Sequence, residues 1–159
     1  MKLKKLVVVV GLALLCGMTS VTLAQAQSSD ELGKAIADNY LEALKKVNEL
    51  TKDRPDPKDL TPKVEALKEE TIKEMVALGQ KVAALDEAGK KKAEAKMAMA
   101  FSATPMDVFK PFSEGQQFYL QKDPNLGKLI KDFNIITQYA FFDLLKKQDP
   151  KEAERLGVK

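Results

Sequence analysis

The sequence contains no histidine, no tryptophan and one cysteine, Cys16, which lies in an apolar N-terminal run. The rest of the chain therefore lacks cysteine and histidine, the two residue types that form zinc sites of the usual kind. The same absences exclude a covalent c-type haem, a thioredoxin-like redox pair, the commonest catalytic triads and the Glu-x-x-His di-metal site of helical bundles. We expect a protein that is not an enzyme and has no metal site and no cofactor.

The N-terminus has the features of a secretory signal peptide. Three lysines precede an apolar run over residues 6–18, and small and polar residues follow it. Ala24 and Ala26 place small side chains at the third and first positions before a cut, which suits signal peptidase. We predict cleavage after Ala26, which divides the chain into a signal peptide, residues 1–26, and one helical domain, residues 27–159. We expect the protein to be exported to the periplasm, with secretion into the medium as the alternative.

Cys16 leaves two alternatives open for the leader. A bacterial lipoprotein signal usually has leucine three positions before the lipidated cysteine and glycine, alanine or serine directly before it. Ala13 and Leu15 occupy those positions here, which favours an ordinary apolar residue in a cleaved leader. An uncleaved anchor needs about 20 apolar residues, and three hydroxyl side chains interrupt the second half of this run. We expect no stable membrane insertion after cleavage.

The predicted mature domain carries no net charge. The whole chain has a formal charge of +3, but the leader contributes three lysines and no acidic residue. A nucleic-acid partner would require a net positive surface, so we expect none. Because residues 27–159 contain no cysteine, no disulfide can hold them, and stability must come from one apolar core.

Capping residues and prolines mark the expected helix starts. Thr and Asp side chains accept hydrogen bonds from the first free N–H groups of a helix, and proline suits the first turn because it has no N–H there. Ser28 and Glu31 have the spacing of a capping box. Four further starts combine a capping residue with a following proline: Thr61-Pro62, Thr104-Pro105, Asp123-Pro124 and Asp149-Pro150.

Hydrophobic periodicity predicts two long helices in the first half of the domain. Apolar residues recur at steps of three and four over residues 32–50 and again over residues 64–85. Residues 52–60 connect the two helices, and the two prolines in this segment are expected to keep it out of helix.

The second half is predicted to contain an alanine-rich third helix that ends near Ala103, followed by a segment that Pro111 breaks in two. A last long helix over residues 124–147 and a short tail helix that stops at Gly157 complete the chain. No alternating strand pattern is present. The predicted fold class is all-α, an antiparallel helical bundle of four main helices with short extra helices.

Two groups of side chains could support acid–base catalysis or copper(I) binding, but their spacing does not bring them together. The glutamates of the second helix alternate with lysines, a pattern typical of a solvated face. An enzyme that uses only carboxylates and lysines would need an acid and a base that converge in a cleft, and this pattern does not indicate one. Met97 and Met99 have the soft ligands that copper(I) prefers, but residues two apart point to opposite sides of a helix.

Aromatic residues are concentrated in the C-terminal third, where nine of the ten lie beyond residue 100. In an α-helix over residues 124–147, Ile135, Tyr139 and Phe142 would form a second apolar stripe at i, i+4 and i+7. Two alternatives remain for this stripe: residues 105–122 cover it, or it contacts a partner.

We predict a non-enzymatic exported protein that binds protein, as a cell-envelope accessory, an adaptor or a chaperone-like factor. Its partner could also be a second copy of the chain, as a homo-oligomer. The alternative is a small apolar ligand or lipid, held in a pocket of the aromatic-rich half. For either partner, the candidate binding residues are Phe109, Phe112, Ile135, Tyr139 and Phe142.

Cleavage after Ala26 is directly testable. The chain recovered from the envelope fraction or the medium of its own cells should begin at Gln27, because signal peptidase selects the small side chains before that bond. N-terminal sequencing and intact mass measure this. A chain that begins at Cys16 with a lipid mass added, or that keeps residues 1–26, would contradict the prediction.

Overall fold

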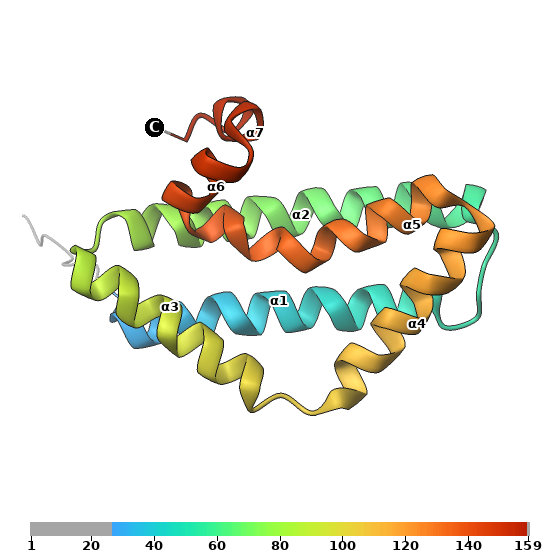
Figure 1. Cartoon of the computed structure of the whole chain (residues 1–159), viewed down its shortest axis with the longest axis horizontal. Coiled ribbons are helices and arrows are strands. Elements are labelled where there is room, and N and C mark those ends of the chain that lie inside the picture. Colours follow the sequence, from blue (N-terminus) through green and yellow to red (C-terminus); the bar gives the residue numbers. More distant parts are fainter. Residues whose placement is uncertain (1–26, 159) are drawn as a thin grey trace, which may run out of the picture.

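The computed structural model describes residues 27–158, and every regular element within that range is helical (Figure 1). This confirms the all-α prediction. The elements are α1 (Ser29–Thr51), α2 (Pro57–Ala83), α3 (Glu87–Ser102), α4 (Met106–Lys122), α5 (Pro124–Lys131), the 3₁₀ helix η1 (Asp132–Ala140), α6 (Phe142–Gln148) and α7 (Pro150–Arg155).

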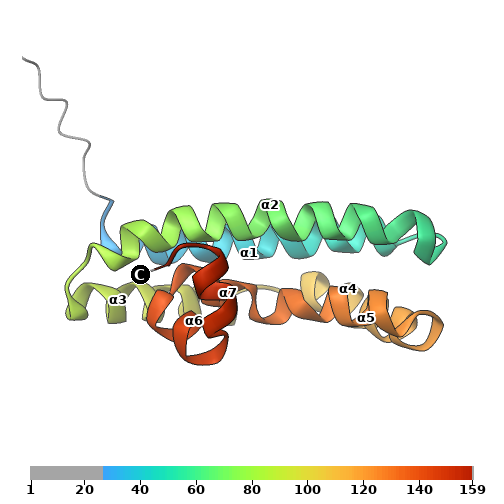
Figure 2. The same ribbon diagram turned by 90° about the horizontal axis from the view of Figure 1, so that it is seen from above.

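The helices lie in two layers. Figure 2 shows α1 and α2 side by side in one layer and α3, α4 and α5 in the other. The helices α3 and α4 follow each other along α1 and run in its direction, because Lys92 of α3 pairs with Asp30 and Val108 of α4 accepts a hydrogen bond from Asn48. The connection between α3 and α4 projects away from α1, and α6 and α7 fold back over one side of the molecule (Figure 1).

The predicted capping box is confirmed at the start of α1. The Ser28 hydroxyl accepts a hydrogen bond from the Glu31 N–H at 3.3 Å, and the Glu31 carboxylate accepts one from the Ser28 N–H at 2.8 Å. Asp123 and Asp149 cap α5 and α7 ahead of their prolines, as expected. Each of these side chains satisfies N–H groups that the helix itself leaves free.

Two predictions that depended on proline are wrong: the helix start at Pro62, with residues 52–60 outside helix, and the break at Pro111. The helix α2 begins at Pro57 under an Asp56 cap rather than at Pro62, and α4 continues through Pro111. A proline inside a helix removes one hydrogen bond to the carbonyl four residues earlier. At both prolines that carbonyl belongs to an exposed residue of the first turn, Lys58 or Asp107. Water can solvate it there, so the cost is too small to stop the helix.

The predicted last long helix is also wrong, because it is divided into α5, η1 and α6. Residues 134–137 are Asn, Ile, Ile and Thr, which are weaker helix formers than alanine or leucine. A 3₁₀ helix has three residues per turn, so Phe133, Ile136 and Tyr139 line up on one face. All three are buried, and the η1 geometry therefore directs a continuous apolar row into the core.

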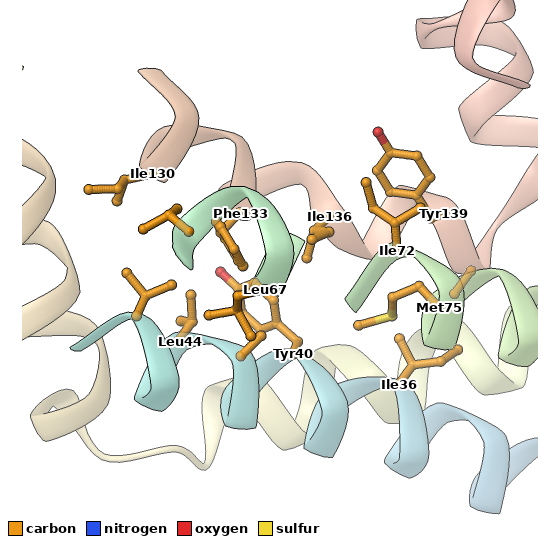
Figure 3. Close-up of a cluster of buried hydrophobic side chains, with 14 of the residues drawn as sticks. Ile36, Tyr40, Leu44, Leu67, Ile72, Met75, Ile130, Phe133, Ile136 and Tyr139 are labelled. Carbon is orange, nitrogen blue, oxygen red and sulfur yellow. The ribbon is translucent and has the colours of Figure 1, made fainter. Parts of the chain in front are cut away.

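The core lies between the two layers. Figure 3 shows side chains of α1, α2 and the α5–η1 segment pointing toward one another. Ile36 and Leu44 of α1 and Met75 of α2 are fully enclosed in this cluster, together with Phe133 and Ile136. Each such side chain contributes about 1.5–3 kcal/mol relative to exposure, and this burial must hold a fold without disulfides.

A close approach fixes the position of α3 on α1. A Cβ atom added at Gly33 would collide with the Ala93 carbonyl oxygen and would lie 2.8 Å from Cβ of Lys96. Ala93 itself is fully buried. The two backbones can meet here because one residue has no side chain and the other has only a methyl group.

Gly33→Ala should lower the free energy of unfolding by about 1–2 kcal/mol. Alanine gains up to about 1 kcal/mol in helix propensity, but the clash with backbone atoms of α3 outweighs it. Urea unfolding followed by circular dichroism measures the change. Lys34→Ala, at the adjacent exposed position, is the control and should change stability by less than about 0.5 kcal/mol. A stabilised Gly33→Ala variant would show that the approach of α3 is not close.

Candidate functional site: a groove between α1 and α4

The five residues predicted to bind a partner do not share one surface. Phe112 and Tyr139 are core residues with 4% and 7% of their surface exposed, and Phe109 and Phe142 are half-buried. Ile135 alone among the five is exposed, at 54%.

The expected stripe of Ile135, Tyr139 and Phe142 is absent because η1 is not an α-helix. Residues four apart in a 3₁₀ helix lie about 120° apart around the axis, whereas in an α-helix they share a face. Tyr139 is therefore buried, and Figure 3 shows its ring over Ile72 with the hydroxyl directed away from the cluster. This placement corrects the interpretation of the stripe, and Tyr139→Ala would remove a core side chain rather than a surface anchor.

Tyr139 holds the C-terminal tail in place. Its hydroxyl donates a hydrogen bond to the Glu152 carboxylate at 3.2 Å, and the Arg155 guanidinium donates two more to that carboxylate at 2.7 Å. Arg155 also lies 3.7 Å from Glu69 on α2. Burial raises the pKa of Tyr139 well above its ordinary value, and the hydrogen bond from Arg155 lowers the pKa of Glu152. These contacts connect α7 to both η1 and α2.

Phe142 packs on a glycine of α2. A Cβ atom at Gly79 would lie 2.5 Å from the Phe142 ring and 2.8 Å from the Tyr139 carbonyl oxygen. Phe142 also borders a groove of about 430 Å³ with Phe141 and Leu144. Phe142 therefore packs the first turn of α6 against Gly79 of α2.

A larger groove of about 580 Å³ follows the contact between α1 and α4. Asn48 contacts Val108 near one end, and Arg54 lies over Phe118 at the other, so the two helices run in the same direction along it. Figure 1 shows α4 rising from the α3–α4 connection toward the C-terminal end of α1. The lining comprises Lys45, Asn48, Glu49, Thr51, Lys52 and Arg54 on the α1 side and Asp107, Val108, Pro111, Glu114, Gly115 and Phe118 on α4.

The α4 side of the groove forms an apolar floor. Val108, Pro111, Gly115 and Phe118 are spaced i, i+3, i+7 and i+10, which places them on one face of an unbroken helix. Phe112 and Tyr119 lie on the adjacent face and enter the core. Sequence reasoning missed the floor because it broke the helix at Pro111, although the spacing was present in the sequence.

Charged side chains line both rims without pairing across the groove. The α1 rim carries Lys45, Lys52 and Arg54 with one acid, Glu49, and the α4 rim carries Asp107 and Glu114. All six are exposed, and within residues 27–158 no ion pair joins the two rims. Glu114 lies 4.0 Å from Lys110 on its own helix, a pair that solvent screens strongly.

Hydrogen bonds fix the groove walls. The Asn48 amide donates to the Val108 carbonyl at 2.8 Å, and the Tyr119 hydroxyl donates to the Pro55 carbonyl at 2.8 Å. Burial raises the pKa of Tyr119 above its ordinary value, so the donor proton stays bound at physiological pH. The Arg54 guanidinium lies 4.6 Å from the centre of the Phe118 ring, a cation–π contact that closes one end of the groove. The groove is therefore preformed.

Residues 27–158 offer no group of three or more acidic, cysteine or histidine side chains arranged to hold a metal ion. None of the helices in that range is long and apolar enough to cross a membrane. A further groove of about 520 Å³ between α1 and α2 is bordered by four carboxylates and Lys46. Its apolar lining consists of Ala35, Ala43 and Leu67, without an aromatic residue such as Phe118 of the α1–α4 groove.

Comparisons with protein-family models, with curated proteins and with solved structures found no match to this chain.

The tail contact predicts a pH dependence of stability. Because the pKa of Glu152 is lower in the folded than in the unfolded chain, its contribution is present above its unfolded pKa of about 4.3 and disappears as the pH falls through the folded value. Glu152→Gln should lower the free energy of unfolding by about 1 kcal/mol at pH 7 and by much less at pH 3. Urea unfolding at both pH values measures the difference.

Glu154→Gln is the matched control, because Glu154 lies on the same helix and is exposed. It should leave stability nearly unchanged at both pH values. An equal loss for Glu152→Gln at pH 7 and pH 3 would mean that the carboxylate charge contributes nothing.

Proposed function

We propose that this chain is an exported, non-enzymatic protein that binds a protein partner through the groove between α1 and α4. A role as a cell-envelope accessory, adaptor or chaperone-like factor fits such a module. We further propose that its scaffold is an antiparallel bundle of four main helices. In this bundle α3 and α4 together form the third helix, and α5 and η1 together form the fourth. The contacts of α3 and α4 along α1 support that interpretation.

The observation that carries the proposal is the combination of an apolar floor with charged rims that do not pair with each other across the groove. Val108 and Phe118 on the floor are half-buried, and Pro111 is exposed. Protein interfaces typically have an apolar centre that excludes water and a polar border that contacts solvent. The groove has this arrangement before any partner is bound, and its walls are already held by Asn48 and Tyr119, so little ordering would be needed on binding.

A small apolar ligand is the second candidate, and the size of the groove favours it. A volume of about 580 Å³ lies within the range of small-molecule sites. The residues expected to enclose such a ligand are placed differently, however. Phe112 and Tyr139 belong to the core, and Phe118 is the one aromatic residue that lines this groove. Six charged residues around the opening also suit a protein segment better than a lipid chain.

Site-specific photocrosslinking in the protein's own cells tests the proposal. A photoreactive phenylalanine analogue at Glu114, on the groove rim, should form an adduct of several kilodaltons or more. The additional change Phe118→Ala should reduce the adduct yield at least about fivefold, because removal of an aromatic anchor commonly costs more than 1 kcal/mol of binding. Circular dichroism should show the helical signal unchanged, since Phe118 is only half-buried.

The same analogue at Ile135 is the control, because that residue is exposed on a different element. An adduct of a few hundred daltons at Glu114 would favour the small ligand instead. Equal adducts at both positions, or adducts at Ile135 alone, would exclude the α1–α4 groove as the binding surface.

A further inference from the structure

The two rims of the groove carry opposite charges. Three cations and one acid border it on the α1 side, whereas the charged lining residues of α4 are Asp107 and Glu114. Two lysines of α4 lie nearby: Lys110 is 4.0 Å from Glu114, and Lys122 is 5.8 Å from the centre of the Phe118 ring. Both carboxylates are exposed, as are Lys45 and Lys52 opposite them. No ion pair within residues 27–158 joins the rims, and the Glu114–Lys110 pair is exposed and screened by solvent, so a bound molecule can compete for the charges of both rims.

The dimensions of the floor match a short helix. Val108 and Phe118 are ten residues apart on α4, which corresponds to a floor of about 15 Å, or nearly three helical turns. A helix presents side chains along one face at i, i+3 or i+4, and i+7, and it carries its polar residues on the two flanks of that face. An apolar face on the floor would place one flank beside each rim.

We propose that the groove binds an amphipathic helix of a partner protein in a single direction, and that the charged rims select this direction. The inference rests on the proposed function and specifies the partner: a helix of about three turns with an apolar face, acidic residues on one flank and basic residues on the other. The acidic flank lies beside Lys45 and Lys52, and the basic flank lies beside Asp107 and Glu114.

The selection of direction follows from symmetry. Turning a helix end for end while its apolar face stays on the floor exchanges its two flanks. In the wrong direction each flank then faces a rim of its own sign, and like charges repel. A helix with both signs mixed on each flank gains no advantage in either direction. The rims therefore decide orientation and specificity, while the apolar floor supplies most of the affinity.

Three designed helical peptides of 18 residues with blocked ends test this inference. All share one apolar face and one composition; the first has glutamates on one flank and lysines on the other, the second has these flanks exchanged, and the third mixes them. Fluorescence anisotropy with the folded protein measures affinity. The first two peptides should bind with equal affinity and about tenfold more tightly than the third at low salt, and 0.5 M salt should largely abolish this advantage.

A benzophenone at the N-terminus of each peptide reports direction. The first two peptides should crosslink to opposite ends of the groove, one near Lys45 and the other near Phe118, and the mixed peptide to both ends. The variant Asp107→Asn/Glu114→Gln should bind all three peptides with affinities within about threefold of one another. Ser113→Ala, on the exposed side of α4 away from the groove lining, is the control and should behave as the unmodified protein.

Equal affinity of all three peptides for the unmodified protein, with crosslinks at both ends, would overturn the selection of direction and leave protein binding intact. If none of the peptides binds, the groove does not accept a helix, and the inference is wrong. The photocrosslinks at Glu114 in cells then decide separately whether the groove binds protein at all.

Discussion

The packing of α1 against α2 in its own layer and against the helices of the other layer is the interaction on which the rest of the structure depends. One face of α1 contacts α2, and its other sides contact α3, α4 and η1. The approach to α3 is possible because Gly33 leaves room for the backbone at Ala93. With α3 held at the first half of α1, the chain must bend outward before α4 returns to the second half (Figure 1). The groove lies along that returning contact, so its position follows from the way α1 is covered.

The 3₁₀ helix η1 decides which C-terminal side chains enter the core and which face solvent. Three residues per turn bring Phe133, Ile136 and Tyr139 into one row, and this row packs onto the layer formed by α1 and α2 (Figure 3). The same geometry leaves Ile135 facing solvent. Beyond η1, the tail is held by Phe142 on Gly79 and by the contacts among Tyr139, Glu152 and Arg155. The aromatic residues of this region therefore stabilise the fold, and the candidate binding surface lies on α4 instead.

The candidate site combines rigid walls with rim charges that do not pair across the groove. Asn48 and Tyr119 hold the wall by hydrogen bonds to backbone carbonyls, which are insensitive to the identity of the neighbouring side chains. Lys45, Lys52 and Glu114 remain exposed around it. A preformed groove of this kind loses little conformational entropy when it binds, and its exposed charges affect association rate and orientation more than affinity.

Helical class and most helix starts could be predicted from the sequence because they depend on neighbouring residues: the Ser28–Glu31 capping box, the Asp-Pro starts and the three-and-four spacing of apolar residues. The start of α2 ahead of Pro62 and the continuation of α4 through Pro111 could not be predicted, since a helix tolerates a proline only where the carbonyl four residues earlier reaches water. The 3₁₀ geometry of η1 was decided by the core, which accepts a row of residues three apart. Tertiary structure also decided that Tyr139 is buried and that Val108 and Phe118 line a groove, because burial depends on which helix lies opposite, and local spacing carries no information about that.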